Sequence, residues 1–340
     1  MPPTGRGREM TDNPTAGDTA AAQANLAHIR SLERNDLDAV VAVDQNLSGR
    51  SRRGFFTRRL DHATRDPAAF VGLAAERDGR FAGFVFARIE EGEFGAATRE
   101  ASLDAIGVDL ALAGRHGVGR ALLDRLAAEL RARGIDELAT QVDWTDHRLI
   151  GFFSGAGFVL APRVVLERGA GDPVPGGDAQ EEPAEDQTFK SPPPDPLRVR
   201  SMAREDLPAL VAIDRRITGR DRPAYYARKL EEVFSESGVR MSLVAEIDQH
   251  PAGFIMARVD FGEFGHTEPE AVMDTIGVDP RHEHEGVATA LLSQLTANLG
   301  ALRAESLRTE VSWNRFDLLS FLDRTGFRPH RRLALRLSLN

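Results

Sequence analysis

The chain contains no cysteine among its 340 residues. That absence excludes a disulfide framework, a thiol nucleophile and a cysteine-ligated metal site. No apolar run approaches the ~20 residues that a membrane-spanning helix needs, and no secretory signal pattern opens the chain. We therefore expect a cytoplasmic protein that does not enter a membrane.

Lysine and tryptophan are scarce as well. The only lysines are Lys190 and Lys229, so arginine carries almost all of the positive charge, and the formal net charge is -9. A mildly acidic chain argues against a broad nucleic-acid surface, because phosphate backbones attract proteins that present positive charge. We expect no nucleic-acid partner.

The two halves of the chain repeat each other. Residues 29–60 align without a gap on residues 199–230, and the only two tryptophans, Trp144 and Trp313, occupy matching positions. The period is about half the chain, so we expect a duplicated domain rather than a solenoid. Each half is long enough to bury a core of its own.

One stretch in each half joins a buried strand to a glycine loop and a helix. Residues 104–108 form a short apolar run, and leucines recur at helical spacing after Gly117 and Gly119. The first N–H groups of a helix have no partner within it, so they attract anions, and phosphate is the expected ligand. A plain tight turn is the alternative. The arrangement returns over residues 274–292.

Periodicity and turn residues predict the order β-α-α-β-β-β-α-β-α-β in each half, with a strand over 104–108 and a final strand over 158–166 in the first. We expect an α/β fold with a mixed sheet and helices on both faces. Residues 1–27 predict a disordered tail, 28–168 the first domain, 169–197 an acidic Pro/Gly-rich linker, and 198–340 the second domain.

This element order resembles the GNAT superfamily of acyl-CoA-dependent N-acetyltransferases. The family's signature is Arg or Gln, two residues, Gly, one residue, then Gly or Ala. Gly117 and Gly119 fill its last positions in the first half, and Gly286 and Ala288 fill them in the second. Each half also ends in the family's Gly-Phe pair, at 157–158 and 326–327. The resemblance implies two tandem GNAT-like domains with acetyl-CoA as co-substrate.

The resemblance also implies which residues hold acetyl-CoA. The loop N–H groups would bind the pyrophosphate, and a splayed fourth strand would offer main-chain hydrogen bonds to the pantetheine arm. The implied residues are Ile106, Gly107, Val108, Arg115, His116, Gly117, Val118, Gly119 and Arg120 in the first half, and Ile276, Gly277, Val278, Gly286, Val287 and Ala288 in the second. We expect no metal site, since His282 and His284 are typical of solvated loop residues.

The halves differ where the signature begins. That position is Gly114 in the first half, where the neighbouring Arg115 can substitute, and Glu283 in the second, which Glu285 follows. A like-charge pair at ~4 Å costs about 1 kcal/mol in water and several times more when partly desolvated. Unless those carboxylates turn outward, the N-terminal domain is therefore the expected cofactor site.

Acetyl transfer needs a base, because only a neutral amine attacks a thioester. In the family this is often a carboxylate on or beside the fourth strand. The candidates are Asp104 and Glu93 in the first half and Asp274 and Glu263 in the second. For the aspartates the alternative is a buried carboxylate that anchors a helix, and for the glutamates it is a solvated turn.

The family's usual general acid, a tyrosine in the last helix, is replaced by Phe153 and Leu322. This favours slow turnover or a non-catalytic domain, although a thiol of pKa ~8.5 is already a fair leaving group. Two hypotheses follow. The chain is an N-acetyltransferase that acts on an amine of a small molecule or protein, chiefly through its N-terminal domain. The alternative is a non-catalytic binding or regulatory module, for example an acyl-CoA sensor.

Two further expectations concern contacts. Basic residues repeat beside the second helix of each half and suit an anionic group on the acceptor or the 3′-phosphate of CoA, with salt bridges to nearby acids as the alternative. These residues are Arg50, Arg52, Arg58 and Arg59 in the first half and Arg220, Arg222, Arg228 and Lys229 in the second. The two domains either pack on each other or the chain forms a homodimer.

Overall fold

The computed structural model describes residues 27–91, 99–112, 117–176, 197–236, 241–260, 264, 270–301 and 304–340. The first half contains β1 (His28–Ser31), α2 (Leu37–Ser48), α3 (Arg53–Arg65), β2 (Phe70–Arg77), β3 (Arg80–Glu91), β4 (Arg99–Val108), α4 (Val118–Ala132), β5 (Glu137–Asp143), α5 (His147–Gly155), β6 (Val159–Leu160) and β7 (Arg163–Gly169).

The second half repeats this series. It contains β8 (Leu197–Ser201), α6 (Leu207–Thr218), α7 (Pro223–Glu236), β9 (Leu243–Ile247), β10 (His250–Asp260), β11 (Glu270–Val278), α8 (Val287–Ala301), β12 (Ser306–Ser312), α9 (Phe316–Arg324), β13 (Arg328–Pro329) and β14 (Arg332–Ser338). None of the described helices is long and apolar enough to span a bilayer.

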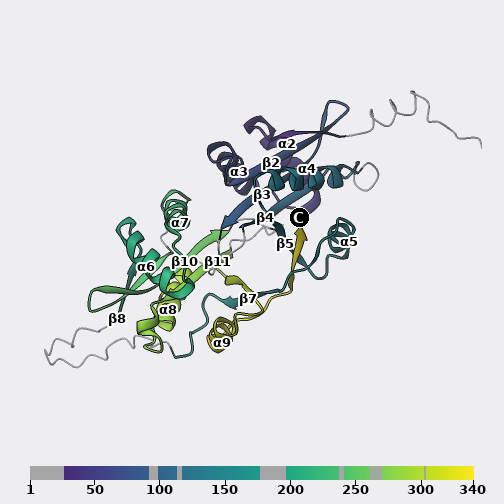
Figure 1. Ribbon diagram of the computed structural model, residues 1–340. Coiled ribbons are helices and arrows are strands. Elements are labelled where there is room, and N and C mark those ends of the chain that lie inside the picture. The colour runs from purple at the N-terminus through teal and green to yellow at the C-terminus, as the bar shows by residue number, and fades with distance from the viewer. Residues whose placement is uncertain are drawn as a thin grey trace, which may run out of the picture.

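The strands form two seven-stranded mixed sheets, ordered β1-β2-β3-β4-β5-β14-β6 and β13-β7-β12-β11-β10-β9-β8. We call the first sheet with α2–α5 lobe 1, and the second with α6–α9 lobe 2 (Figure 1). The expected α/β fold with two tandem domains is confirmed, and the lobes pack on each other within one chain.

Each sheet is covered on both faces. In lobe 1, Leu103 and Val85 belong to the core cluster that includes the apolar stripe of α4. Phe84, Phe86 and Ala105 belong to a second cluster, with residues of α2 and α3. This division follows from strand geometry, because neighbouring side chains point to opposite faces. Lobe 2 has the same two layers.

The last strand of each half crosses to the other lobe. β7 pairs with β12 from Ser306 to Ser312, and β14 pairs with β5 from Glu137 to Asp143. In Figure 1 the yellow C-terminal strand accordingly ends against lobe 1. The exchange buries Leu166 in the core of lobe 2 and Leu335 in the core of lobe 1. The sheets are therefore not made of the two halves as they follow in sequence.

The predicted strand over 158–166 is wrong in two respects. It is split into β6, which stays in lobe 1 beside β14, and β7, which joins lobe 2. The break falls at 161–162, where the crossing chains meet and the Ala161 N–H donates to the Ala334 carbonyl at 2.9 Å. β7 then continues to Gly169, and Val174 beyond it is buried against lobe 2, inside the stretch predicted to be linker.

β4 is longer than predicted, beginning at Arg99 rather than at 104. The residues that precede the predicted strand alternate between polar and apolar, as in a strand with one polar face. Glu100 and Ser102 face the other lobe and are buried there, while Ala101 and Leu103 face the core. The polar face of this strand is explained by the contact between the lobes.

The strand exchange predicts how the chain responds to cleavage. A cut within 177–196 should leave one particle of about the intact mass, 37.2 kDa, because each fragment still holds the other's seventh strand through seven residue pairs. Size-exclusion chromatography with mass detection checks this. Fragments that separate under native conditions would contradict it.

Candidate functional site

In each lobe two central parallel strands diverge into a V. β4 and β5 pair from Glu100 to Ser102 only, although both strands run on. The Thr140 hydroxyl donates to the Leu103 carbonyl at 3.0 Å where they part. β11 and β12 part in the same way after Val272. Beyond these points no described strand pairs with the main chain of β4 and β11 on the open side, so a ligand can bind it there.

A β-bulge lies at each point of divergence. The register of β3 against β4 shifts so that Asp104 has no residue opposite it, and the same shift leaves Asp274 unopposed on β11. Bulges re-aim side chains beside functional sites. Both candidate aspartates therefore stand at the apex of a V.

The helix after each V begins at an open glycine. Gly117 has φ +65°, Gly286 has φ +78°, and nothing lies within 4 Å of where a Cβ would stand on either. The first helical bonds run from Ala121 N–H to the Gly117 carbonyl and from Ala290 N–H to the Gly286 carbonyl. The three N–H groups between have no acceptor within the helix, which is the arrangement that binds phosphate.

The other predicted cofactor residues fall along this path. Ile106, Gly107 and Val108 lie on the diverging end of β4, and Ile276, Gly277 and Val278 lie on that of β11. Val118, Gly119 and Arg120 form the first turn of α4, and Val287 and Ala288 that of α8. A Cβ on Gly119 would come within 3.1 Å of Phe152, so this glycine lets α4 and α5 pack closely. Arg115, His116, Glu93 and Glu263 lie outside the described residues.

Asp104 is tied to a helix. Its side chain is completely buried, and Oδ2 lies 3.0 Å from Nε of Arg59 on α3. The Arg59 guanidinium also lies over the rings of Phe55 and Phe70, at 5.2 and 5.8 Å. This pair fastens α3 to the bulge of β4, as the anchoring alternative for this aspartate requires.

Asp274 is held more loosely. It lies 3.5 Å from Lys229 Nζ and 3.3 Å from Arg258 Nε, and its side chain is 12% exposed. It lines a cavity that Asp104 does not reach. The two equivalent aspartates therefore differ in their access to solvent.

Arg59→Met should destabilise the protein by about 3 kcal/mol, because it leaves the Asp104 carboxylate buried without its cation. Urea denaturation measures the change. The double variant Arg59→Met/Asp104→Leu should recover most of the loss, since it removes both charges. Equal stability of wild type and Arg59→Met would contradict the anchoring role.

The loop of lobe 2 carries cations as well as the predicted acids. Glu285 Oε2 lies 2.9 Å from His282 Nδ1, and Glu283 is exposed. Arg281 and Arg216 bind the buried Asp279 at 2.7 and 2.6 Å. The hydrogen bond from Arg281 lowers the pKa of Asp279 to about 2. The repulsion expected from the two glutamates is therefore partly offset.

The repeated basic cluster is largely used for ion pairs within each lobe. Arg52 Nε donates to Asp44 Oδ2 at 2.9 Å, and Arg222 makes the same contact with Asp214. Together with Arg59 and Lys229, four of the eight residues are thus bound to acids. The salt-bridge alternative is confirmed for these four.

The positions of the missing tyrosine acid are part of the core. Phe153 and Leu322 are 1% and 0% exposed. Tyr225 and Tyr226 are buried on α7, in the cluster that includes Phe254. Phe153 and Leu322 have no proton to donate, and the two tyrosines are not exposed, so none of the four is placed to act as a general acid.

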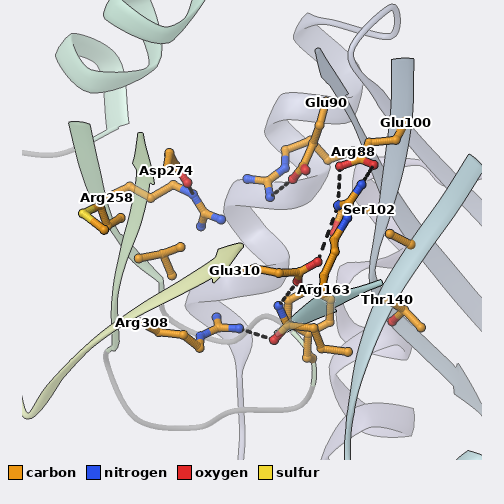
Figure 2. A pocket seen from close by; sticks show the side chains of 15 residues that line it. Arg88, Glu90, Glu100, Ser102, Thr140, Arg163, Arg258, Asp274, Arg308 and Glu310 are labelled. Carbon is orange, nitrogen blue, oxygen red and sulfur yellow. Dashed lines mark hydrogen bonds and ion pairs between the residues drawn. The ribbon is translucent and has the colours of Figure 1, made fainter. Parts of the chain in front are cut away.

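A cavity of about 80 Å³ lies between the lobes. Figure 2 shows Glu310 at its centre, between the strands of lobe 1 and lobe 2. We call it the interlobe chamber. Its charged lining consists of Arg88, Arg163, Arg258 and Arg308 against Glu90, Glu100, Asp274 and Glu310, with Ser102, Thr140 and Gln141 among the polar residues. The charges balance, as expected for groups withdrawn from bulk water.

Arg163 joins the lobes across this chamber. It is carried by β7 in lobe 2 and binds both oxygens of Glu100 in lobe 1, one at 2.7 Å. It also lies 3.5 Å from Glu310 and 3.7 Å from Glu137. Gln141 completes the junction, because its amide donates to Glu310 at 2.5 Å and accepts from Arg308.

Burial raises the pKa of Glu100 to about 7, against the opposing effect of Arg163. A carboxyl whose pKa is raised on folding adds stability below its unfolded value and loses that contribution as the pH rises through the folded value. The unfolding free energy of wild type, relative to Glu100→Gln, should therefore fall between pH 5 and pH 8. Urea titrations across this range test it, and a pH-independent difference would contradict it.

One group among the described residues has metal-ligand spacing: Glu167, Glu270 and His330. His330 Nδ1 accepts the Arg332 N–H at 3.2 Å, so in the neutral ring Nε2 carries the proton and faces Glu167 at 3.5 Å. A metal-bound histidine instead donates from its other nitrogen. Glu270 is bound by Arg308 at 2.9 Å. We assign no metal to this group.

These features agree with the comparison to known families. The model of the acetyltransferase (GNAT) family matches residues 40–158 and 207–327. Because these regions span well over half of the chain, the protein belongs to the GNAT family.

Individual relatives are more distant. A mycothiol acetyltransferase from Clavibacter michiganensis subsp. michiganensis is 33% identical over 141 residues, which span 40% of this chain and 43% of that protein. A tandem GNAT protein from the clavulanic acid biosynthesis pathway covers 93% of this chain and 99% of its own, with TM-score 0.61 and 16% identity. A GNAT structure from Sphaerobacter thermophilus covers 92% and 96%, with TM-score 0.57 and 16% identity. The two structures establish the shared fold.

Sequence reasoning missed the interlobe residues Gln141, Arg163 and Glu310. A signal was present, because the repeat places the polar residues Gln141 and Glu310 at matching positions, each between a threonine and a valine. What the sequence lacked was the partner surface. Only the packing of the lobes explains polar side chains there.

Proposed function

We propose that this protein transfers an acetyl group from acetyl-CoA to an amine of a small molecule or protein, chiefly through lobe 1. The observation that carries the proposal is the V of β4 and β5 beside the open N-terminus of α4 at Gly117. The unpaired main chain of β4 suits the pantetheine arm, and the free N–H groups suit the pyrophosphate. Family membership supports acetyl-CoA as the co-substrate.

The difference between the loops supports lobe 1 as the cofactor site. In the sequence the lobe 1 loop from Leu110 to Gly117 carries no acid, whereas exposed Glu283 and Glu285 precede Gly286 in lobe 2. A phosphate approaching α8 meets this negative charge, which the nearby cations offset only in part. Lobe 2 then serves as a structural or weakly active partner.

A binding or regulatory module without catalysis is the second candidate. The observations that favour it are the Asp104–Arg59 pair, which occupies a predicted base, and Phe153 and Leu322 in place of an acid. Turnover separates the two functions, because a sensor binds acetyl-CoA without releasing its thiol.

Gly117→Glu should remove most acetyl-CoA binding. The backbone at residue 117 has φ +65°, which strains a residue with a side chain, and the new carboxylate would lie where the pyrophosphate binds. Calorimetric titration with acetyl-CoA measures the affinity and the stoichiometry. Gly286→Glu is the matched control, with the same φ strain and the same open space in lobe 2. Unchanged affinity in Gly117→Glu would contradict the assignment to lobe 1.

A further inference from the structure

We propose that Glu310, carried by lobe 2, is the general base for acetyl transfer at lobe 1. The inference rests on the proposed function. Among the described residues of lobe 1 the candidate base is Asp104, which is enclosed at the apex of the V and bound to Arg59, so a base is still needed there. Lobe 2 supplies the carboxylate of Glu310 to lobe 1 from the opposite side of the interlobe chamber.

The position of Glu310 follows from one hydrogen bond. Its Oε2 accepts from Gln141 Nε2 at 2.5 Å. Gln141 lies on β5 two residues beyond Ala139, the last residue paired with β4, so it stands on the diverging arm of the V. Glu310 thus lies beside the apex of the lobe 1 V, where Ser102 and Thr140 line the same chamber. In Figure 2 the carboxylate points toward these strands.

The surroundings keep this carboxylate in place and tune it. Arg163 of β7, Arg308 of β12, Glu90 of β3 and Glu100 of β4 are charged groups that act on it, together with the amide of Gln141. Burial raises its pKa, and Arg163 opposes the shift most. The side chain is still 22% exposed. A fixed carboxylate of raised pKa with access to water is well suited to remove a proton from an ammonium group.

The two halves are not equivalent here. Glu310 and Gln141 occupy matching positions of the repeat, on β12 and β5. An amide cannot take up a proton at neutral pH, whereas a carboxylate can. Lobe 2 therefore presents a base to lobe 1, and lobe 1 presents only a hydrogen-bonding group to lobe 2. This asymmetry matches the assignment of acetyl-CoA to lobe 1.

The step balances without a further reactant. Glu310 takes one proton from the acceptor's ammonium group, directly or through a water molecule. The neutral nitrogen attacks the thioester carbonyl, the C–N bond forms and the C–S bond breaks. The second nitrogen proton goes to the departing thiolate, and Glu310 later releases its proton to water. With water as the acceptor the same steps give acetate and free CoA.

The test is Glu310→Gln, which preserves the size of the side chain. The assay follows thiol release from acetyl-CoA, first with water and then with ethanolamine as the acceptor, across pH 6 to 10. We expect a loss of about 100-fold or more at pH 7. The loss with ethanolamine should shrink as the pH rises and free amine forms. The affinity of Glu310→Gln for acetyl-CoA, measured by calorimetric titration, should differ from that of wild type by less than about threefold.

The matched control is Glu137→Gln, which removes another carboxylate near Arg163, at 3.7 Å, from outside the chamber lining. Its pH profile should equal that of wild type. A Glu310→Gln variant with the wild-type rate, or with the same fractional loss at every pH, overturns the inference and leaves the proposed function standing.

The loop variants test which lobe Glu310 serves, since it also stands on the β12 arm of lobe 2. Thiol release should survive Gly286→Glu and be lost in Gly117→Glu. The reverse result overturns the inference. If the wild-type chain binds acetyl-CoA but releases no thiol, both the transferase activity and the role of Glu310 as general base are contradicted. If it does not bind acetyl-CoA, the proposed function is contradicted.

Discussion

Without the exchanged strands β5 and β12 would each be an exposed sheet edge, and in this protein each half of the chain covers the edge that the other leaves open. β5 and β12 diverge from their inner neighbours, so each depends on its outer neighbour for main-chain hydrogen bonds. β14 and β7 supply those bonds along the full length of both strands. The exchange thus lets each V stay open on one side while its outer arm remains fixed. It also brings the two outer arms together, which creates the interlobe chamber.

At the interlobe chamber the two repeated domains meet and differ from each other. Gln141 and Glu310 meet across it from equivalent positions, and Arg163 reaches from one lobe into the other. Two carboxylates at these positions would repel each other, whereas an amide donates a hydrogen bond to a carboxylate. The divergence of the two halves is therefore expected at their contact, and it is there that their chemistry differs.

Much of the fold could be predicted from the sequence, because the repeat, the apolar periodicity and the Gly-Phe pairs are local signals. The exchange of β7 and β14 could not. β7 begins at Arg163 and β14 at Arg332, and the two strands have nearly the same apolar pattern, so the pattern does not distinguish which sheet each joins. The N–H groups at Gly117 follow from helix geometry alone. The Asp104–Arg59 pair does not, because a one-residue bulge and a contact across 45 positions decide it.

The strand exchange also bears on how the gene can change. Each half of the chain supplies one strand to the sheet of the other lobe, so a mutation that unfolds either lobe disturbs both, and natural selection for the function of one lobe acts on the core of both. Leu291 and Leu292 in lobe 2 are thereby constrained as strictly as Leu122 and Leu123 in lobe 1. The loop before Gly286 lies outside both cores, and its Glu283 and Glu285 are exposed. The strand exchange in this way keeps each lobe folded through selection on the other.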